Sequence, residues 1–94
     1  MKFRAAKVDS NQNELVKALR DFGCSVYIVS MVKGFVDIIV GYNGVNYLFE
    51  IKTKTGKVSE IQKRLHATWR GKIHVVRNID DCLQIIKGNN NVES

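Results

Sequence analysis

The tetrapeptide Gly41-Tyr42-Asn43-Gly44 constrains the fold of this 94-residue chain more than any other feature of the sequence. Asn-Gly is the strongest short-range hairpin signal, because both central residues of a type I′ turn require positive φ. The segments on either side, residues 35–40 and 45–54, are rich in apolar and β-branched residues, as strands are. The sequence therefore predicts an antiparallel hairpin with Asn43 and Gly44 at the centre of its turn.

This turn sets the register of the two strands. If Tyr42 faces Val45, every cross-strand pair sums to the same total, and Asp37 lies directly opposite Glu50. Opposed residues share one face of a sheet, with their Cβ atoms about 4.5–5.5 Å apart. Lys52 is the next side chain on that face, because strand side chains alternate. A four-residue loop over the same tetrapeptide keeps this pairing, since it is centred on the same point.

Two opposed carboxylates in apolar strands need a partner. Like charges directly opposed in a sheet are destabilising, and Asp37 in the run Phe35-Val36-Asp37-Ile38-Ile39-Val40 must be paired or shift its pKa. A divalent cation satisfies Asp37 and Glu50 together, and Mg²⁺ takes oxygen ligands while it keeps several waters. Lys52 then lies where it can touch a metal-bound water or a phosphate oxygen. The alternative is a half-exposed hairpin face on which Lys52 neutralises one carboxylate.

The rest of the chain predicts an α/β fold. Residues 9–22 form an amphipathic pattern that Asp9 or Ser10 can cap and Gly23 ends. Residues 24–32 resemble a strand buried on both faces. Residues 59–70 predict a helix, residues 72–77 a strand, and residues 80–87 a helix capped by Asn78 and ended by Gly88. The order is αβββαβα, with a mixed sheet flanked by helices in a single domain over residues 1–88 and a flexible tail over residues 89–94.

Positive charge is concentrated in the second half of the chain. Fifteen Lys and Arg against nine Asp and Glu give a net charge of +6, which favours a polyanionic partner, nucleic acid first. Within residues 52–77 only Glu60 opposes the cations Lys52, Lys54, Lys57, Lys63, Arg64, Arg70, Lys72 and Arg77. We interpret this stretch as a phosphate-contacting surface; a merely solvated face is the alternative.

Two further features concern where the protein works. No apolar run approaches the roughly 20 residues that span a bilayer, so we expect no membrane segment. Cys24 and Cys82 lie among apolar residues, which is typical of reduced core cysteines. We therefore expect a cytoplasmic protein, a location compatible with a bacterial or phage-encoded setting.

Three segments in this order resemble the PD-(D/E)xK nuclease superfamily: Gly34-Phe35-Val36-Asp37, Phe49-Glu50-Ile51-Lys52 and Ser59-Glu60-Ile61-Gln62. The short chain with an acidic residue on its first helix is most similar to the VRR-NUC family. Archaeal-type Holliday junction resolvases share much of this layout. The resemblance covers residues 9–77. It departs at Val36, where the family usually has proline.

The resemblance implies a restriction-endonuclease-like fold and a metal site. Asp37 and Glu50 would bind Mg²⁺ or Mn²⁺, with the backbone carbonyl of Ile51 as third ligand. Glu14 would reach the metal through water or bind a second ion, although a helical ion pair with Lys17 also explains this residue. Lys52 would be the catalytic lysine.

The resemblance also assigns roles to residues beyond the metal. Gln62 would line the site, and a helix capping box with Ser59 explains it equally well. The cations that would hold the DNA backbone are Lys54, Lys57, Lys63, Arg64 and Arg70. No segment predicts readout of base edges, so recognition is expected to rest on DNA shape.

The function expected from these features is Mg²⁺-dependent, structure-selective cleavage of DNA, at four-way (Holliday) junctions or other branched DNA. Paired cuts need two active sites, which a homodimer supplies most simply. Residues 24–32 and residues 3–8 are the expected sources of its interface. The alternatives are a non-catalytic basic module that binds nucleic acid and a general nicking or tRNA-type nuclease without junction preference.

Overall fold

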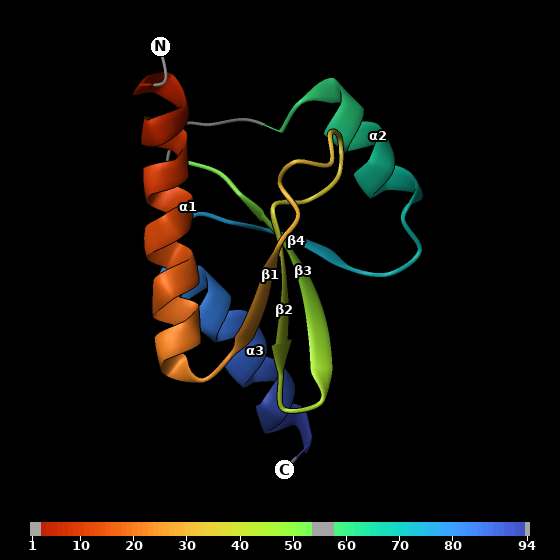
Figure 1. Ribbon diagram of the computed structural model, residues 1–94. Helices are drawn as coiled ribbons and strands as arrows, with labels where there is room; N and C mark the ends of the chain where they lie inside the picture. Colours follow the sequence, from red (N-terminus) through yellow and green to blue (C-terminus); the bar gives the residue numbers. More distant parts are fainter. Residues whose placement is uncertain (1–2, 54–57, 94) are drawn as a thin grey trace.

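A computed structural model describes residues 3–53 and 58–93, and the side chains of residues 11–53 and 58–88. Its elements follow the predicted order αβββαβα, which is therefore confirmed (Figure 1). They are α1 (Phe3–Phe22), β1 (Ser25–Ile28), β2 (Ile38–Tyr42), β3 (Val45–Ile51), α2 (Glu60–Thr68), β4 (Ile73–Val76) and α3 (Ile79–Glu93).

The four strands form one mixed sheet in the order β1-β2-β3-β4. β2 pairs antiparallel with both β1 and β3, whereas β4 runs parallel to β3. A parallel neighbour requires a crossover connection, usually a helix, and α2 lies in that connection. The mixed sheet expected from the sequence is confirmed.

The hairpin has the predicted register. Tyr42 pairs with Val45 and Ile38 with Phe49. Asn43 and Gly44 have φ of 51° and 82°, the positive values that a type I′ turn requires. The turn chemistry read from the sequence therefore positions β2 against β3.

The core lies between one face of the sheet and two helices. α1 and α3 cover this face together (Figure 1). Side chains from both helices and from β2, β3 and β4 are completely buried there, among them Leu19, Ile38, Val40, Phe49, Val76 and Ile86. α2 stands on the other side of the sheet, next to the loop between β1 and β2 (Figure 1).

Gly34 lets that loop approach α2 closely. It has φ of +80°, and a Cβ atom at this position would lie 2.7 Å from Cγ2 of Ile61 in α2. A larger residue would meet both the strained backbone conformation and this contact. Phe35 also packs against Trp69, with ring centroids 5.8 Å apart. α2 is thus held against the loop that leads into β2.

Two helix boundaries differ from the sequence prediction. α1 begins at Phe3, so neither Asp9 nor Ser10 caps it. α3 continues through Gly88 to Glu93, where the sequence predicted a flexible tail; glycine in a helix is costly but does not forbid it. The cap at Asn78 is confirmed, since its Oδ1 accepts the Asp81 N–H at 2.9 Å.

The predicted strand over residues 24–32 is wrong in extent and burial. β1 has only four residues, which alternate between exposed and half-buried. It is an edge strand, and no described helix covers the outer face of the sheet beside it. Tyr27 on this face is 73% exposed.

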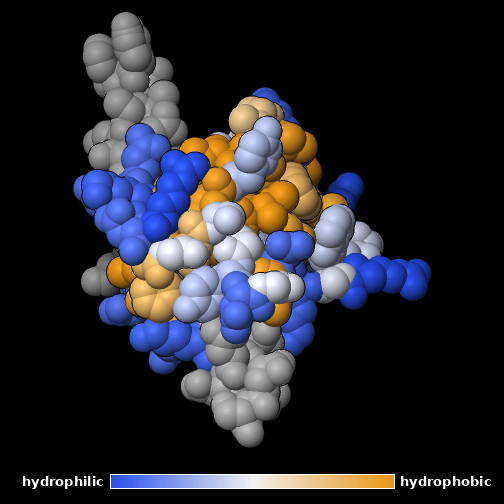
Figure 2. Space-filling view, turned by 60° about the horizontal axis from the view of Figure 1, so that its bottom comes forward, coloured by the Kyte–Doolittle hydropathy of each residue, from blue (hydrophilic) through white to orange (hydrophobic). Residues whose placement is uncertain are grey.

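A row of apolar residues crosses all four strands on the outer face of the sheet, the face that also carries Asp37 and Glu50. Tyr27, Ile39, Leu48 and Ile73 are successive cross-strand partners, so they form one row on this face. Val75 follows beside it and is 40% exposed. Figure 2 shows apolar residues gathered into a broad surface area flanked by hydrophilic side chains. We call these five residues the outer apolar face.

Among the described residues, none of the helices combines the length and apolar character needed to cross a membrane.

Candidate active site

Asp37 and Glu50 meet at the end of the sheet where β2 begins and β3 ends. They line a pocket of about 230 Å³. The other residues that line it are Ile51, Lys52, Thr53, Gln62 and, from α1, Asn11 and Gln12. The structure thus brings together four of the side chains that the sequence placed in one site: Asp37, Glu50, Lys52 and Gln62.

One side-chain and two backbone hydrogen bonds hold Asp37 in place. Its Oδ2 accepts the backbone N–H of Ile51 at 2.8 Å. Its own N–H donates to the carbonyl of Phe49 at 3.1 Å, and its carbonyl accepts the N–H of Val29 at 2.9 Å. In an extended strand a residue's N–H and C=O point to the same side. The Ile51 carbonyl therefore faces the Asp37 side of β3.

Glu50 is an almost fully buried acid. The residue is 2% exposed, and its Oε2 lies 3.1 Å from Nζ of Lys52. Its Oε1 is buried and has no hydrogen-bond partner among the described residues. A buried oxygen with negative charge and no partner is costly, so either a proton or a bound cation would stabilise this carboxyl group.

The two carboxyl groups have raised pKa values. Burial is the main cause for both, and the charge of Asp37 raises the pKa of Glu50 further. Opposing effects come from the Ile51 N–H, from Lys52 and from a side-chain hydrogen bond with Glu50 on Asp37, and from Lys52 and Gln62 on Glu50. One ammonium group therefore faces two acids, and the ionised site lacks a second positive charge.

A divalent cation fits this donor set. The available ligands are carboxylate oxygens of Asp37 and Glu50 and the carbonyl of Ile51, all hard oxygen atoms of the kind that Mg²⁺ and Mn²⁺ accept. Within residues 3–53 and 58–93 no group of three or more His, Cys, Asp and Glu side chains could hold a metal. Water would complete the coordination, as is usual for Mg²⁺.

Gln62 fulfils both roles that the sequence left open. Ser59 caps α2, with a capping box in which the Gln62 N–H donates to Ser59 Oγ at 3.2 Å and Gln62 Oε1 accepts the Ser59 N–H at 3.3 Å. Its Nε2 donates to the carbonyl of Phe35 at 3.1 Å, two residues before Asp37. The same side chain thus fixes the start of α2 and lines the pocket.

Glu14 is not brought to this pocket. It is exposed and lines a neighbouring depression with Arg77. The first helix instead contributes Asn11 and Gln12, which the sequence prediction did not include. Gln12 is buried, and its Nε2 donates to Oγ of Ser30 at 3.4 Å. Its position three and four residues before Leu15 and Val16 was the available signal, because a polar residue within an apolar stripe faces the interior.

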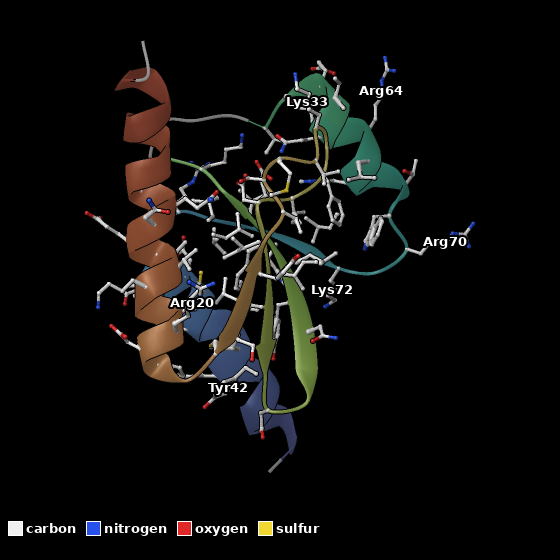
Figure 3. The ribbon with its side chains drawn as sticks, viewed as in Figure 1. Arg20, Lys33, Tyr42, Arg64, Arg70 and Lys72 are labelled. Carbon is white, nitrogen blue, oxygen red and sulfur yellow. The ribbon has the colours of Figure 1, made fainter. Side chains whose placement is uncertain are left out.

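The predicted phosphate-contacting residues are only partly described. Lys54 and Lys57 lie outside the described residues. Arg64 and Arg70 extend into solvent from α2 and from the segment after it (Figure 3). Lys63 is exposed and lies 3.5 Å from Glu60.

Lys33 adds a cation that the sequence prediction missed. It precedes Gly34 in the loop that packs on α2, and it lies on the same side of the molecule as Arg64 (Figure 3). A lysine at the tip of a loop between two apolar strands was the signal for it. We call Lys33, Lys63, Arg64 and Arg70 the α2 basic surface.

Comparison of the chain with protein-family models, with curated proteins and with solved structures found no match.

Proposed function

We propose that this protein is a metal-dependent nuclease that hydrolyses phosphodiester bonds in DNA. The observation that carries the proposal is the buried Glu50 carboxylate, opposite Asp37 and 3.1 Å from Lys52, with one oxygen unpartnered. The resemblance of the three sequence segments to PD-(D/E)xK nucleases supports the same reaction. A non-catalytic binding module is the weaker candidate, because it gains nothing from a buried and a half-buried acid beside a phosphate-binding surface.

Each residue of the pocket would have a separate role in the proposed reaction. Asp37 and Glu50 would hold Mg²⁺ or Mn²⁺, which when bound polarises the phosphate and lowers the pKa of a coordinated water. The Ile51 N–H keeps the Asp37 carboxylate oriented, with a bond of 2.8 Å. Lys52 is positioned to orient or deprotonate the attacking water and to neutralise charge that develops on the phosphate. Gln62 holds α2 and its cations against the site.

The α2 basic surface is the proposed binding site for the DNA backbone, together with Lys54 and Lys57. Its residues are exposed and lie on the side of the sheet from which α2 contributes to the pocket. Phosphate contacts give affinity that depends on salt and not on sequence. Recognition of branched DNA would then come from the shape of the substrate.

The outer apolar face supports a homodimer. α2 covers only part of the outer face, which leaves Tyr27 73% and Val75 40% exposed. Monomeric proteins rarely expose large contiguous apolar areas, and a two-fold dimer buries such an area against its own copy.

The cysteines Cys24 and Cys82 are both buried and unpaired, as in proteins of a reducing compartment, which supports a cytoplasmic location.

The central experiment measures cleavage of four-way, flapped, linear and single-stranded DNA by the wild type and by Asp37→Asn, Glu50→Gln and Lys52→Ala. We expect each variant to lose activity by about a hundredfold or more, as for removal of a catalytic acid or base. We expect cleavage to require Mg²⁺ or Mn²⁺. Ca²⁺ should support cleavage poorly, since it is larger and its coordination geometry is less strict. The matched control is Asp21→Asn, at an exposed acid paired with Lys17.

Three outcomes would contradict parts of the proposal. Cleavage that persists in excess EDTA would exclude the metal mechanism. Near-normal cleavage by any of the three site variants would show that the site is misassigned. Equal rates on branched and linear DNA would favour the general nuclease over the junction-selective one.

The dimer is tested separately, by sedimentation at micromolar concentration. We expect a dimer for the wild type and a monomer for Tyr27→Glu, because a buried unpaired charge opposes association. Gln84→Glu, on the exposed side of α3, is the control and should stay dimeric. A monomeric wild type would exclude this interface.

A further inference from the structure

Trp69 is an exposed aromatic residue among the cations of the α2 basic surface. It is the only tryptophan of the chain. It forms the C-cap of α2, where its backbone N–H donates to the carbonyl of Leu65 at 2.8 Å. The residue is 40% exposed. Tryptophan is highly buried on average, so an indole this open on a basic surface calls for a physical explanation.

The ring is held in place from the side of the candidate active site. Phe35 packs against it, with ring centroids 5.8 Å apart, and the Phe35 carbonyl accepts Gln62 Nε2 at 3.1 Å. Gln62 lines the pocket of Asp37 and Glu50. Trp69 and the two acids therefore share the outer side of the sheet, which places the indole beside the path of a nucleic acid bound at the pocket.

A shallow depression of about 360 Å³ adjoins the indole. Thr68, Trp69, Arg70 and Gly71 line it. Gly71 keeps it open, because a Cβ atom at this position would lie only 3.1 Å from Nε1 of Trp69. Arg70 extends into solvent beside it (Figure 3). The depression thus offers an aromatic surface with a cation next to it.

This combination fits an unpaired nucleobase. Sites for single-stranded nucleic acid join a positively charged surface, which follows the phosphates, to aromatic rings on which bases stack. In residues 58–72 the only acid is Glu60, which lies 3.5 Å from Lys63, so the charge around the indole favours a polyanion. A base inside a duplex has no free face, because its neighbours stack on it. An unpaired base offers a flat apolar face with a phosphate on either side.

We propose that Trp69 stacks on an unpaired base next to the phosphate that is cleaved. This inference rests on the proposed nuclease function and names what the protein recognises in branched DNA: a base left exposed at the branch. Phe35 supports the indole, and Arg70 contacts a neighbouring phosphate. Stacking tolerates every base, which agrees with recognition of shape and not of sequence.

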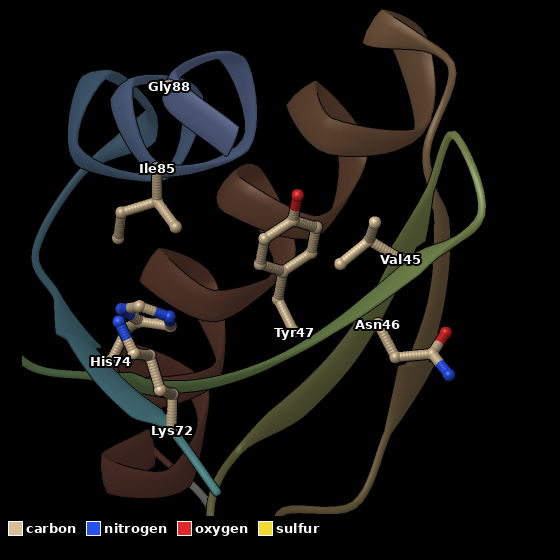
Figure 4. Close-up of a pocket in the computed structure, with 7 residues that line it drawn as sticks. All are labelled: Val45, Asn46, Tyr47, Lys72, His74, Ile85 and Gly88. Carbon is tan, nitrogen blue, oxygen red and sulfur yellow. The ribbon is translucent and has the colours of Figure 1, made fainter. Parts of the chain in front are cut away.

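A larger pocket, of about 490 Å³, lies between the sheet and α3 on the opposite face of the sheet. Val45, Tyr47, His74 and Ile85 line it with Asn46, Lys72 and Gly88 (Figure 4). It includes no residue of α2 and no tryptophan. A signal from Trp69 therefore reports on the α2 side of the molecule.

The test uses tryptophan fluorescence, since Trp69 is its single source. The protein is titrated in EDTA with an oligothymidylate of about ten nucleotides, within the site sizes of single-strand binders. We expect saturable quenching as a base stacks on the indole. An abasic strand of equal length carries the same charge without bases, so it should bind more weakly and leave the fluorescence nearly unchanged.

Variants are compared by fluorescence anisotropy of labelled strands. Trp69→Leu keeps an apolar side chain without the ring, so it should weaken the oligothymidylate about tenfold and leave the abasic strand unchanged. Trp69→Phe should recover most of the affinity. The salt dependence should stay the same in Trp69→Leu, whereas Arg70→Gln should lower its log–log slope by about 0.7. Lys87→Gln, on the exposed side of α3, is the control and should change neither quantity.

Circular dichroism first verifies that each variant is folded. The proposal is overturned if the oligothymidylate binds without quenching, if the abasic strand quenches equally, or if Trp69→Leu binds the oligothymidylate as tightly as the wild type. These results would leave the nuclease proposal intact, because cleavage by the Asp37, Glu50 and Lys52 variants decides that proposal separately.

Discussion

Replacing Asp37 by Asn should make the metal-free protein more stable. The substitution keeps the shape of the side chain and leaves an oxygen to accept the Ile51 N–H, which bonds to Asp37 at 2.8 Å. It removes one of two acids whose pKa values burial has raised. Glu50 keeps its ion pair with Lys52 at 3.1 Å. The remaining site then carries one negative and one positive charge.

The size of the effect follows from opposing contributions. Two unit charges about 5 Å apart, the spacing of opposed strand residues, repel by about 3 kcal/mol at an effective dielectric constant near 20. Solvent screening reduces this value, because Asp37 is only half-buried. Weakening the Ile51 hydrogen bond from charged to neutral costs about 1 kcal/mol, and the attraction of Asp37 to Lys52 is also lost. We expect a net gain of about 1 kcal/mol, or about 4–8 °C in Tm for a domain of this size.

The assay is thermal unfolding followed by circular dichroism at pH 7.5, in EDTA and in Mg²⁺. In EDTA, Asp37→Asn should melt above the wild type. Mg²⁺ should increase the free energy of unfolding of the wild type only, by about 2.7 kcal/mol when the ion is at a hundred times its Kd. In Mg²⁺ the wild type should therefore melt at a higher temperature than Asp37→Asn. The control Asp21→Asn, at an exposed acid, should follow the wild type in both buffers. A variant that melts below the wild type in EDTA, together with no Mg²⁺ effect on the wild type, would refute the shared cation site.

Four further predictions concern pH, the α2 cap and Tyr47. Because the folded protein holds the protons of Asp37 and Glu50 more tightly than the unfolded chain, the metal-free protein should lose stability as pH rises from about 4 through the raised pKa values, in a pH series of urea denaturation. With Mg²⁺, cleavage should fall as pH drops through the same range, because the metal needs both acids ionised. Ser59→Ala and Gln62→Ala should each destabilise by about 1 kcal/mol through the capping box, but only Gln62→Ala should also slow cleavage in a steady-state assay. Tyr47→Phe should unfold at the same or higher urea concentration than the wild type, since it removes an unsatisfied buried hydroxyl; a clear loss of stability would mean that the hydroxyl has a partner.

The hairpin, and the position of Asp37 opposite Glu50, could be predicted from residues close together in the sequence. The Asn43-Gly44 turn fixes which residues oppose each other, and this register alone places Asp37 across from Glu50. The short spacing from Glu50 to Lys52 then follows from strand alternation. Metal binding, the substrate and the assembly state stay predictions, which the resemblance and the exposed apolar face support.

The errors arose where long-range packing decides the outcome. Residues 24–32 are apolar enough for a strand buried on both faces, but the chain has no helix among its described residues to cover the outer side of β1. The phase of α1 toward the pocket depends on how the helix docks, so Gln12 lines the pocket and Glu14 does not. Caps at Asp9 or Ser10 were chemically suitable, yet the helix extends past both.

The short-range pairing of β2 and β3 has a consequence for how the chain folds. A hairpin closes within about 1–10 μs, whereas the parallel pairing of β4 must wait for the crossover through α2. Zipping that starts at Asn43-Gly44 brings Asp37 toward Glu50 at its final step. The repulsion between these acids therefore opposes an early event, before α2 and β4 have docked. If the candidate site binds Mg²⁺, adding the ion to the refolding buffer should therefore accelerate folding as well as stabilise the folded protein.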